Sequence, residues 1–287
     1  MADIRNDSRI SRILKEALLE DIGVGDITTD SIISSEAIGR ANFLAKESGI
    51  VAGIAVSEAL FRIVDEELGF SAIMNDGTFV QSGTVIASIQ GSVASILKGE
   101  RTALNILQRM SGIATLTKQF IDAVNGTRAK ITDTRKTAPG LRLLDKLAVQ
   151  LGGGINHRYG LDDMVLIKDN HITAAGGIDN AINQCHAYLS AKNYQQNIEV
   201  ETKNLQEVQL ALKHTGIHRI MLDNFPIDEM KKAVQLIDHA VEVEASGNVS
   251  LHNVSAIAET GVDFISVGAL THSPKALDIS LKIVTRD

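Results

Sequence analysis

Three short segments carry side chains that could bind an anion. Asp133-Thr134-Arg135-Lys136-Thr137 sets a guanidinium beside an ammonium. Arg pairs bidentately with a carboxylate or a phosphate, whereas Lys supplies a compact point charge. The run Gly152 to Arg158 ends in His157 and Arg158, and Lys168 directly follows an apolar run. These cations predict an anion-binding pocket if they meet at one mouth, and they are separate solvated charges if they do not.

Two carboxylates, Glu201 and Asp223, follow neighbouring apolar runs at matching depth. Isolated carboxylates that face a basic pocket are typical of Mg²⁺ sites, because this ion keeps several waters and takes few protein ligands. We expect both to hold Mg²⁺ partly, with ligand phosphates and hydroxyls supplying the rest, and a general-base role is the alternative. Glu201 is preferred to Glu199, which strand alternation is expected to turn to the opposite face.

Small residues follow the last two apolar runs, namely Ser246, Gly247 and Asn248, then Ser266 and Gly268. Such residues let backbone N–H groups approach a phosphate at a helix N-terminus. Ser-Gly turns are also frequent in ordinary loops, so the interpretation as a phosphate site depends on a common location with the other groups.

The amino-acid composition argues against several classes of function. A net charge of -7, with no Trp and three Tyr, argues against nucleic-acid binding, which needs many cations or stacking rings. The apolar runs fall short of the ~20 residues that span a bilayer, and no secretory signal is expected, so we predict no membrane partner. The single cysteine, Cys185, suits a reducing compartment, and a cytoplasmic location is expected.

Three tempting signals are rejected. His214 and His218 have metal-ligand spacing, but Gly216 would break the helix that aligns them. Gly23 and Gly25 lack the strand and the complete pattern of a dinucleotide-binding fingerprint. The glycines of 152–154 lack that spacing as well.

The elements that must position these groups are repeated strand-helix units after Lys130. Polar residues follow successive strands at a regular interval of one βα unit, which predicts a parallel sheet. A closed barrel fits better than an open doubly wound sheet, because polar residues sit at the carboxyl end of nearly every strand and not at one switch point. Six strands are predicted, at Ala129 to Asp133, Met164 to Ile167, Ile198 to Val200, Arg219 to Leu222, Val241 to Glu244 and Phe264 to Val267.

The first ~110 residues read as a mixed α+β unit. Helical spacing is expected near Ile10 to Leu18 and over 55–68, and long helical segments over 95–124 with a break near Ser111-Gly112. A strand over 278–284 could rejoin this unit. The fold class is therefore α/β, an incomplete parallel (β/α) barrel at 113–271 with an α+β N-terminal sandwich domain at 1–112, rejoined by 272–287.

Taken together, these blocks resemble quinolinate phosphoribosyltransferase, the carboxylating nicotinate-nucleotide pyrophosphorylase family. The resemblance covers nearly the whole chain and begins with the stretch Glu20 to Thr29. It continues through Glu100 to Asn105, Ser111 to Thr115, Asp133 to Leu141, Gly152 to Arg158, Val165 to His171, Ile198 to Glu201, Met221 to Phe225 and Val243 to Asn248.

The resemblance implies a pentosyltransferase that joins quinolinate to 5-phosphoribosyl 1-diphosphate, releasing diphosphate and CO₂ to give nicotinate mononucleotide for NAD biosynthesis. It implies that Glu201 and Asp223 serve Mg²⁺ and the ribose, and that Lys136 lies close to the ribosyl donor. The 5′-phosphate would lie at Ser246, Gly247, Asn248 and Gly268. It also implies that quinolinate carboxylates meet Arg101, Arg135, His157, Arg158 and Lys168.

The family's site is composite, so Arg101 is expected to reach the barrel mouth of a second subunit in a homodimer. Two departures are mild. Leu147 stands where the family usually shows an aromatic residue, and Asn248 replaces a frequent glycine. Neither change removes a charged group.

Two other functions stay open. A phosphoribosyltransferase of the same superfamily could act on another acid, and quinolinate against nicotinate would separate the two. A noncatalytic phosphosugar-binding protein would bind the donor without releasing diphosphate.

Overall fold

The computed structural model describes residues 4–284, so the outermost ends of the expected domain ranges, 1–3 and 285–287, lie outside the described residues. The chain divides into two compact units. The first comprises Met1–Lys118, Thr137–Gly153 and Thr271–Asp287, and the second comprises Gln119–Lys136 and Gly154–Leu270. Within 4–284, no helix combines the length and the apolar character needed to cross a membrane.

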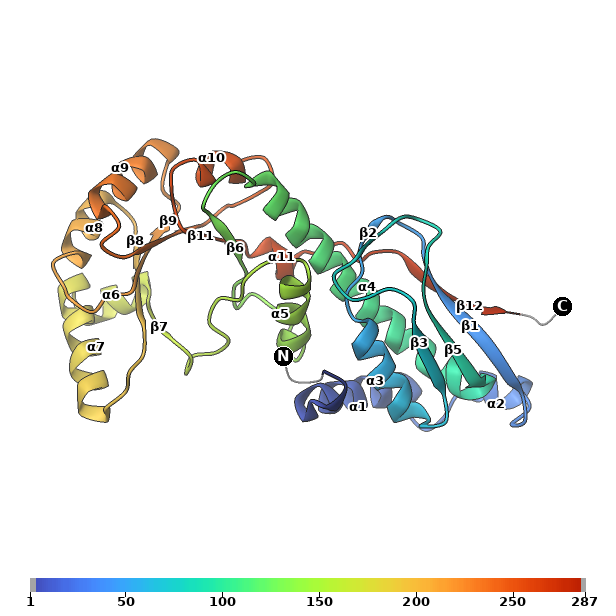
Figure 1. The fold of residues 1–287 in the computed structure, drawn as a ribbon. Coiled ribbons are helices and arrows are strands. Elements are labelled where there is room, and N and C mark those ends of the chain that lie inside the picture. The colour runs from blue at the N-terminus through green and yellow to red at the C-terminus, as the bar shows by residue number, and fades with distance from the viewer. Residues whose placement is uncertain (1–3, 285–287) are drawn as a thin grey trace. The chain divides into compact units, whose positions relative to one another are not determined.

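The first unit is built on a four-stranded antiparallel sheet of order β12-β1-β5-β3 (Figure 1). Its strands are β1 (Ile38–Ala45), β3 (Gly69–Ala72), β5 (Val85–Ser92) and β12 (Ile279–Val284), and β2 (Gly49–Ile50) pairs with β4 (Phe79–Val80). The predicted return of the C-terminal tail is confirmed, because β12 pairs with β1 from Ala45↔Ile279 to Arg40↔Val284.

Helices of the first unit follow the apolar spacing of the sequence. After the short turn η1 (Ile4–Asn6), α1 (Ser8–Ile22) buries Ile10, Leu14 and Leu18 on one face, as predicted. The Asp7 carboxylate caps it by accepting the backbone N–H of Arg9 at 2.8 Å. The other helices are α2 (Ile27–Ile32), α3 (Ile54–Val64) and α5 (Arg142–Leu151).

Helix α4 (Val93–Ala123) is continuous, so the predicted break near Ser111-Gly112 is wrong. Ser111 is fully buried and its hydroxyl accepts the backbone N–H of Ala52 at 3.0 Å. A Cβ at Gly112 would overlap the carbonyl oxygen of Lys275. The pair therefore reflects close packing of another backbone segment against the helix and not an interruption of it.

The segment Thr137–Gly153, which lies inside the expected barrel range, belongs to the first unit. A buried ion pair accounts for this, because Arg109 donates from Nε and Nη2 to the two oxygens of Asp145, each at 2.8 Å. Asp145 is fully buried on α5. A bidentate pair of this kind fixes both the distance and the orientation of two segments.

The second unit is a six-stranded, all-parallel sheet of order β6-β11-β10-β9-β8-β7. The first and last strands of that order, β6 and β7, are not paired with each other, and Ile155 forms only a parallel bridge to Thr132. The predicted incomplete (β/α) barrel is thus confirmed. The strands are β6 (Lys130–Thr132), β7 (Val165–Ile167), β8 (Ile198–Thr202), β9 (Arg219–Asp223), β10 (Glu242–Ser246) and β11 (Phe264–Ser266).

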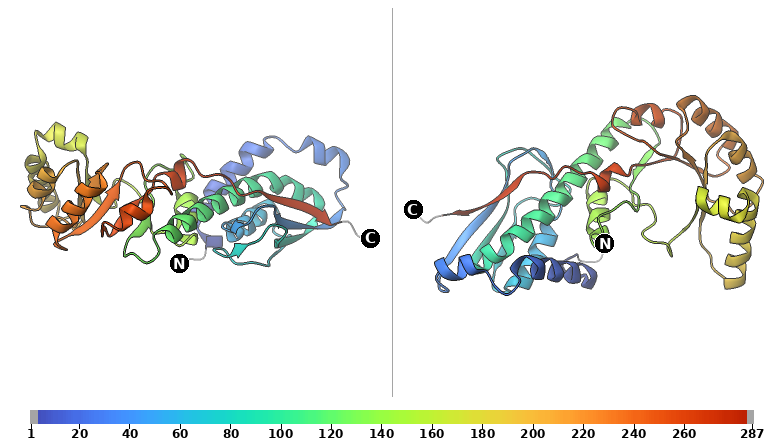
Figure 2. Two further views of the ribbon diagram at one scale, coloured as in Figure 1. Left: turned by 90° about the horizontal axis from the view of Figure 1, so that it is seen from above. Right: turned by 180° about the vertical axis from the view of Figure 1, so that it is seen from behind.

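Helices connect these strands and run along one side of the sheet. Figure 1 and the reverse view in Figure 2 show α7 (Ile178–Lys192), α8 (Leu205–Ala211) and α9 (Ile227–Ile237) side by side. The remaining ones are α6 (Asp169–Ala175) and α10 (Val254–Ala258), and α11 (Ala269–His272) follows β11, which is the last strand of this sheet along the chain. Each βα unit therefore brings the end of its strand to the same edge of the sheet.

We expect Gly112→Ala to destabilise the protein by about 1 to 3 kcal/mol, because the added methyl would force the backbone at Lys275 away. The same change in an open helix would stabilise it by about 1 kcal/mol. Chemical denaturation measures the difference, with Asn105→Ala at an exposed position of α4 as the control. Equal or higher stability of Gly112→Ala would contradict the close contact.

Candidate active site

The carboxyl ends of the parallel strands bring the predicted polar residues to one edge. In the ladder, Asp223 at the end of β9 is the direct partner of Ser246 at the end of β10. The backbone N–H of Asn224 donates to Ser246 O at 2.9 Å and links the two loops that follow. On the other side of β9, β8 ends with Glu201 and Thr202, beside Met221 and Leu222.

Glu201 and Asp223 lie close enough to repel each other. Burial raises the pKa of Glu201, the backbone N–H of Asp169 lowers it through a 3.2 Å bond to Oε1, and the charge of Asp223 raises it again. The result is a carboxyl whose pKa lies above its usual value. Two oxygen donors that carry like charges suit a hard divalent cation, so the residues present fit Mg²⁺.

Two guanidinium groups also lie near each other on the barrel. Burial lowers the pKa of Arg158, and the positive charge of Arg135 lowers it further. Arg158 is held by donating from Nη1 to the carbonyl oxygen of Met164 at 3.0 Å. Like charges held together in a half-buried place are an anion-binding arrangement, because a bound anion removes their repulsion.

The remaining predicted cations are placed differently. Lys168 is exposed at the start of α6, and its charge lowers the pKa of Glu201, which places it on the same edge. Lys136 is exposed after β6, where its backbone N–H donates to the hydroxyl of Thr134 at 3.0 Å. Arg101 belongs to the first unit and is exposed on α4, so the barrel alone does not bring it to the others.

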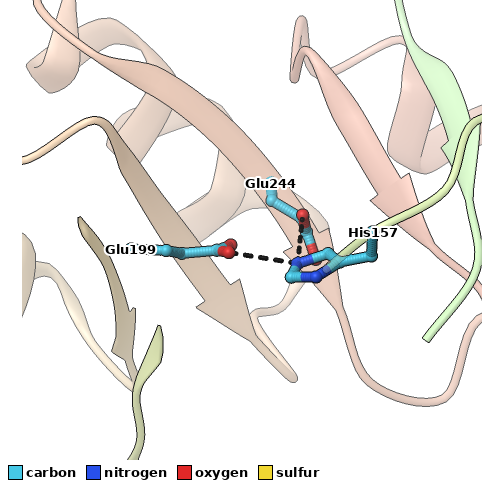
Figure 3. A group of neighbouring side chains, drawn as sticks. All are labelled: His157, Glu199 and Glu244. Atoms are coloured by element: carbon cyan, nitrogen blue, oxygen red, sulfur yellow. Dashed lines mark ion pairs between the residues drawn. The ribbon is translucent and has the colours of Figure 1, made fainter. Parts of the chain in front are cut away.

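His157 lies in a buried cluster that the sequence did not predict. Its Nε2 is 3.0 Å from Glu199 Oε2 and 3.3 Å from Glu244 Oε2 (Figure 3). Both carboxylates are fully buried, and Arg219 Nη1 donates to Glu244 Oε2 at 2.8 Å. The backbone N–H of His157 is fixed by Asp133 Oδ1 at 2.9 Å. Four strands, or the loops beside them, thus contribute to one interior cluster.

The expectation for Glu199 is therefore wrong. Residues two apart on a strand share a face, so Glu199 and Glu201 point to the same side of β8. Glu199 differs from Glu201 in depth, because it lies two residues further from the strand end. At this depth in the barrel Glu199 forms a buried ion pair with His157, whereas Glu201 lies nearer the end of the strand.

The cluster balances its charges by keeping a proton. Burial lowers the pKa of His157, but the two carboxylates raise it to about 9. Burial and the charge of Glu244 raise the pKa of Glu199 to about 7. Nδ1 of the ring accepts the backbone N–H of Arg158 at 2.8 Å, and a second ring proton would break that bond. We therefore place the cluster's proton between Nε2 and the carboxylates, with Arg219 neutralising Glu244.

This arrangement bears on how His157 could act. Both ring nitrogens have protein partners, Arg158 N–H at Nδ1 and the two carboxylates at Nε2. The imidazole is thus held by protein groups at both ring nitrogens, and contact between His157 and a substrate carboxylate stays a prediction.

The expected phosphate residues form two loops. Gly247 has φ 92° and Asn248 φ 51°, both in the left-handed region. The helix after this loop begins only at Val254, so no helix N-terminus follows 246–248 directly, contrary to the expectation. Ser266 is buried, and its hydroxyl donates to the carbonyl oxygen of Ala245 at 3.4 Å, whereas α11 begins directly after Gly268.

Sequence reasoning missed Glu199, Glu244, Arg219 and Asn224. A signal for the first two was present, because a charged residue inside an otherwise apolar strand of a two-sided buried sheet needs a partner. No local signal identifies Asn224.

The fold and the site define a barrel protein of the phosphoribosyltransferase class, with cations and carboxylates gathered at its strand ends. The family models for quinolinate phosphoribosyl transferase match this chain, the N-terminal domain over residues 26–111 and the C-terminal domain over 113–282. The chain therefore belongs to the quinolinate phosphoribosyltransferase family.

Relatives agree over almost the whole length. Quinolinate phosphoribosyltransferase [decarboxylating] 1b of Nicotiana tabacum is 50% identical over 288 residues, covering 95% of this chain and 82% of the relative. The probable carboxylating nicotinate-nucleotide pyrophosphorylase of Synechocystis is 46% identical, covering 94% and 91%. The crystal structure of NadC from Streptococcus pyogenes superposes with a TM-score of 0.92 at 39% identity, covering 97% and 98%.

The buried cluster predicts how stability depends on pH. The folded chain keeps in this cluster, shared between His157 Nε2 and the two carboxylates, a proton that the unfolded histidine releases above a pKa of 6.5. That contribution is fully present below pH 6.5 and is lost as the pH rises through about 9. We expect the free energy of unfolding to fall by roughly 1 to 3 kcal/mol more over this range in the wild type than in His157→Gln. Urea denaturation at several pH values measures it, and identical pH slopes would contradict a retained proton.

Proposed function

We infer that the chain transfers a phosphoribosyl group from 5-phosphoribosyl 1-diphosphate to quinolinate and releases diphosphate and CO₂, giving nicotinate mononucleotide for NAD biosynthesis. The observation that carries this inference is the pair of guanidiniums, Arg135 and Arg158, held against each other's charge on the barrel. A dicarboxylate is the ligand that satisfies two forked cations at once. Family membership supports the same reaction.

The protein's task is to position reactants. The pyridine nitrogen is itself the nucleophile, so Arg135 and Arg158 bind the carboxylates and orient that nitrogen toward C1 of the ribose. As the bond from C1 to diphosphate breaks, positive charge grows on the sugar and negative charge on diphosphate. Lys136 and Lys168 stabilise the negative charge from the barrel edge. No covalent bond to the enzyme is needed.

CO₂ leaves from the carboxyl next to the nitrogen once that nitrogen is quaternary. The positively charged ring stabilises the electron pair left on the ring carbon when the bond to the carboxyl breaks, and that carbon then takes a proton from water. The chain holds the ring in place while the departing carboxyl separates from the cation that binds it.

Glu201 and Asp223 would hold Mg²⁺ and the ribose hydroxyls, and the loop of Ser246, Gly247 and Asn248 would hold the 5′-phosphate together with Gly268. When bound, Mg²⁺ neutralises developing charge on the diphosphate. The mutual repulsion of Glu201 and Asp223 supports this assignment, since a cation removes it.

We also propose a cytoplasmic homodimer with shared sites. The exposed position of Arg101 on α4, in the unit that lacks the barrel, supports a site completed by a second copy. Cys185 is a free, half-buried thiol, which suits a reducing compartment. Some relatives are named chloroplastic or mitochondrial, so imaging a tagged chain in its own cells is the test of location.

Arg135→Ala should lower kcat/KM for quinolinate by more than about 30-fold, because one carboxylate loses roughly 2 to 5 kcal/mol of paired interaction. A coupled diphosphate assay measures this, and circular dichroism shows whether the fold is intact. Arg62→Ala, at an exposed ion pair of the first unit, is the control. A near-normal kcat/KM for quinolinate in Arg135→Ala would contradict the assignment of Arg135 to a quinolinate carboxylate.

The same assay separates the rival substrates. The wild type should release diphosphate with quinolinate and not with nicotinate, which lacks the second carboxylate. Preference for nicotinate would indicate a relative that acts on another acid, and donor binding without diphosphate release would indicate a noncatalytic binder.

The shared site is tested by complementation. If Arg101→Ala and Lys168→Ala each inactivate the enzyme, mixed dimers carry both defects in one site and leave the other wild-type. Random pairing puts about half the chains in such dimers, so about a quarter of wild-type activity should return after subunit exchange. Tagged chains confirm exchange by co-purification. A mixture that exchanges subunits and stays inactive would show that Arg101 does not complete the site of a second subunit.

A further inference from the structure

Three asparagine and aspartate side chains form a chain of hydrogen bonds across the strand ends. Asn224 donates from Nδ2 to Asp223 Oδ2 at 2.8 Å, and Asn248 donates from Nδ2 to Asn224 Oδ1 at 2.9 Å. The chain therefore runs from the phosphate loop, through Asn224, to the carboxylate assigned to Mg²⁺ and the ribose.

The direction of these bonds is fixed by chemistry. An ionised carboxylate only accepts hydrogen bonds, so the NH₂ group of Asn224 must face Asp223. The oxygen of Asn224 then faces Asn248, whose NH₂ group must donate to it. Because each amide can face only one way, the orientation of Asn248 is tied to that of Asp223.

The backbone is shaped to make this chain possible. Asn224 and Asn248 both have left-handed conformations, with φ 56° and 51°, which Asn tolerates better than most residues. A Cβ at Gly247 would overlap the side-chain oxygen of Asn224, so glycine leaves room for the amide to pass. Asn253 Nδ2 donates to the carbonyl oxygen of Asn248 at 3.0 Å and anchors the far end of the loop.

We propose that Asn224 and Asn248 are positioning residues that couple the phosphate loop, residues 246–248, to Asp223. The 5′-phosphate and the ribose of one donor are then held in a fixed position relative to each other. The proposal rests on the proposed function, which assigns the two loops to the same donor. It gives the side chain of Asn248 a task that a glycine could not perform. Binding of the 5′-phosphate then sets the orientation of the carboxylate that faces Mg²⁺.

The test uses glycine at both positions, because glycine adopts the left-handed backbone freely and removes only the amide. The variants of the full chain are Asn224→Gly, Asn248→Gly and the double variant. Asn193→Gly is the matched control, since Asn193 ends α7 in the same conformation, φ 54°. Calorimetry measures donor binding at a series of Mg²⁺ concentrations, and thermal melts report folding.

Loss of a partner that orients a metal-binding carboxylate typically costs tenfold or more in metal affinity. We expect Asn224→Gly to raise the Mg²⁺ concentration for half-maximal donor binding by roughly tenfold, with Tm close to wild type. Asn248→Gly should raise it by a smaller factor, and the double variant should be no worse than Asn224→Gly, because both changes break one chain. Quinolinate affinity and the Asn193→Gly control should stay unchanged.

The outcomes separate the possible failures. Full additivity of the two changes, or weaker donor binding with an unchanged Mg²⁺ requirement, would make Asn248 a phosphate ligand only and overturn the coupling. Unchanged Mg²⁺ dependence in all three variants would overturn it as well. A wild type that binds no donor at any Mg²⁺ concentration would overturn the proposed function and this inference with it.

Discussion

The rest of the barrel depends on keeping charge balanced inside it. Glu199 and Glu244 are fully buried on strands β8 and β10, and Arg219, on β9 between these strands, is the ladder partner of Glu199 and donates to Glu244. A buried carboxylate without a partner would cost several kcal/mol, so each strand can take only the register that brings these groups together. Arg219 also lies 3.9 Å from the ring centre of Phe264 on β11, which extends the same constraint to the next strand. His157, in the loop beside β6, completes the charge balance of this cluster. Because its contacts fix the backbone there, they also fix the backbone of the next residue, Arg158.

At the edge of the barrel, by contrast, groups of like charge lie close together. There, burial and the charge of Arg135 lower the pKa of Arg158, and burial and the charge of Asp223 raise the pKa of Glu201, although Lys168 lies close enough to lower it in part. The interior cluster pairs opposite charges, with His157 next to both carboxylates and Arg219 bonded to Glu244, whereas the edge brings like charges near each other. The two regions lie only two residues apart along β8, at Glu199 and Glu201, so the paired interior adjoins the edge.

Strand positions and the parallel class followed from the sequence because apolar runs and polar strand ends repeat with one βα unit. The return of the C-terminal strand followed from its alternation. Glu199 was misjudged because it was assigned to the face opposite Glu201, although residues two apart on a strand share a face. Its depth in the barrel did not follow from the sequence either, since alternation along β8 gives a face but not a distance from the strand end. The continuity of α4 was hidden because Ser111-Gly112 reads as a breaker until the backbone packed against it is seen. The bonds of Asn224 were beyond prediction, because they join loops that only the ladder between β9 and β10 brings together.

The pairing of β12 with β1 also has a consequence for synthesis. The central sheet of the N-terminal unit acquires its edge strand, β12, from residues that leave the ribosome after every strand of the barrel. Domains generally fold as units in the order of their synthesis, and contacts between distant parts of a chain form late. The nascent chain can therefore complete its barrel while the free edge of β1 still stands open. Until β12 has emerged, the unpaired edge of β1 is open to pairing with a strand of another nascent chain.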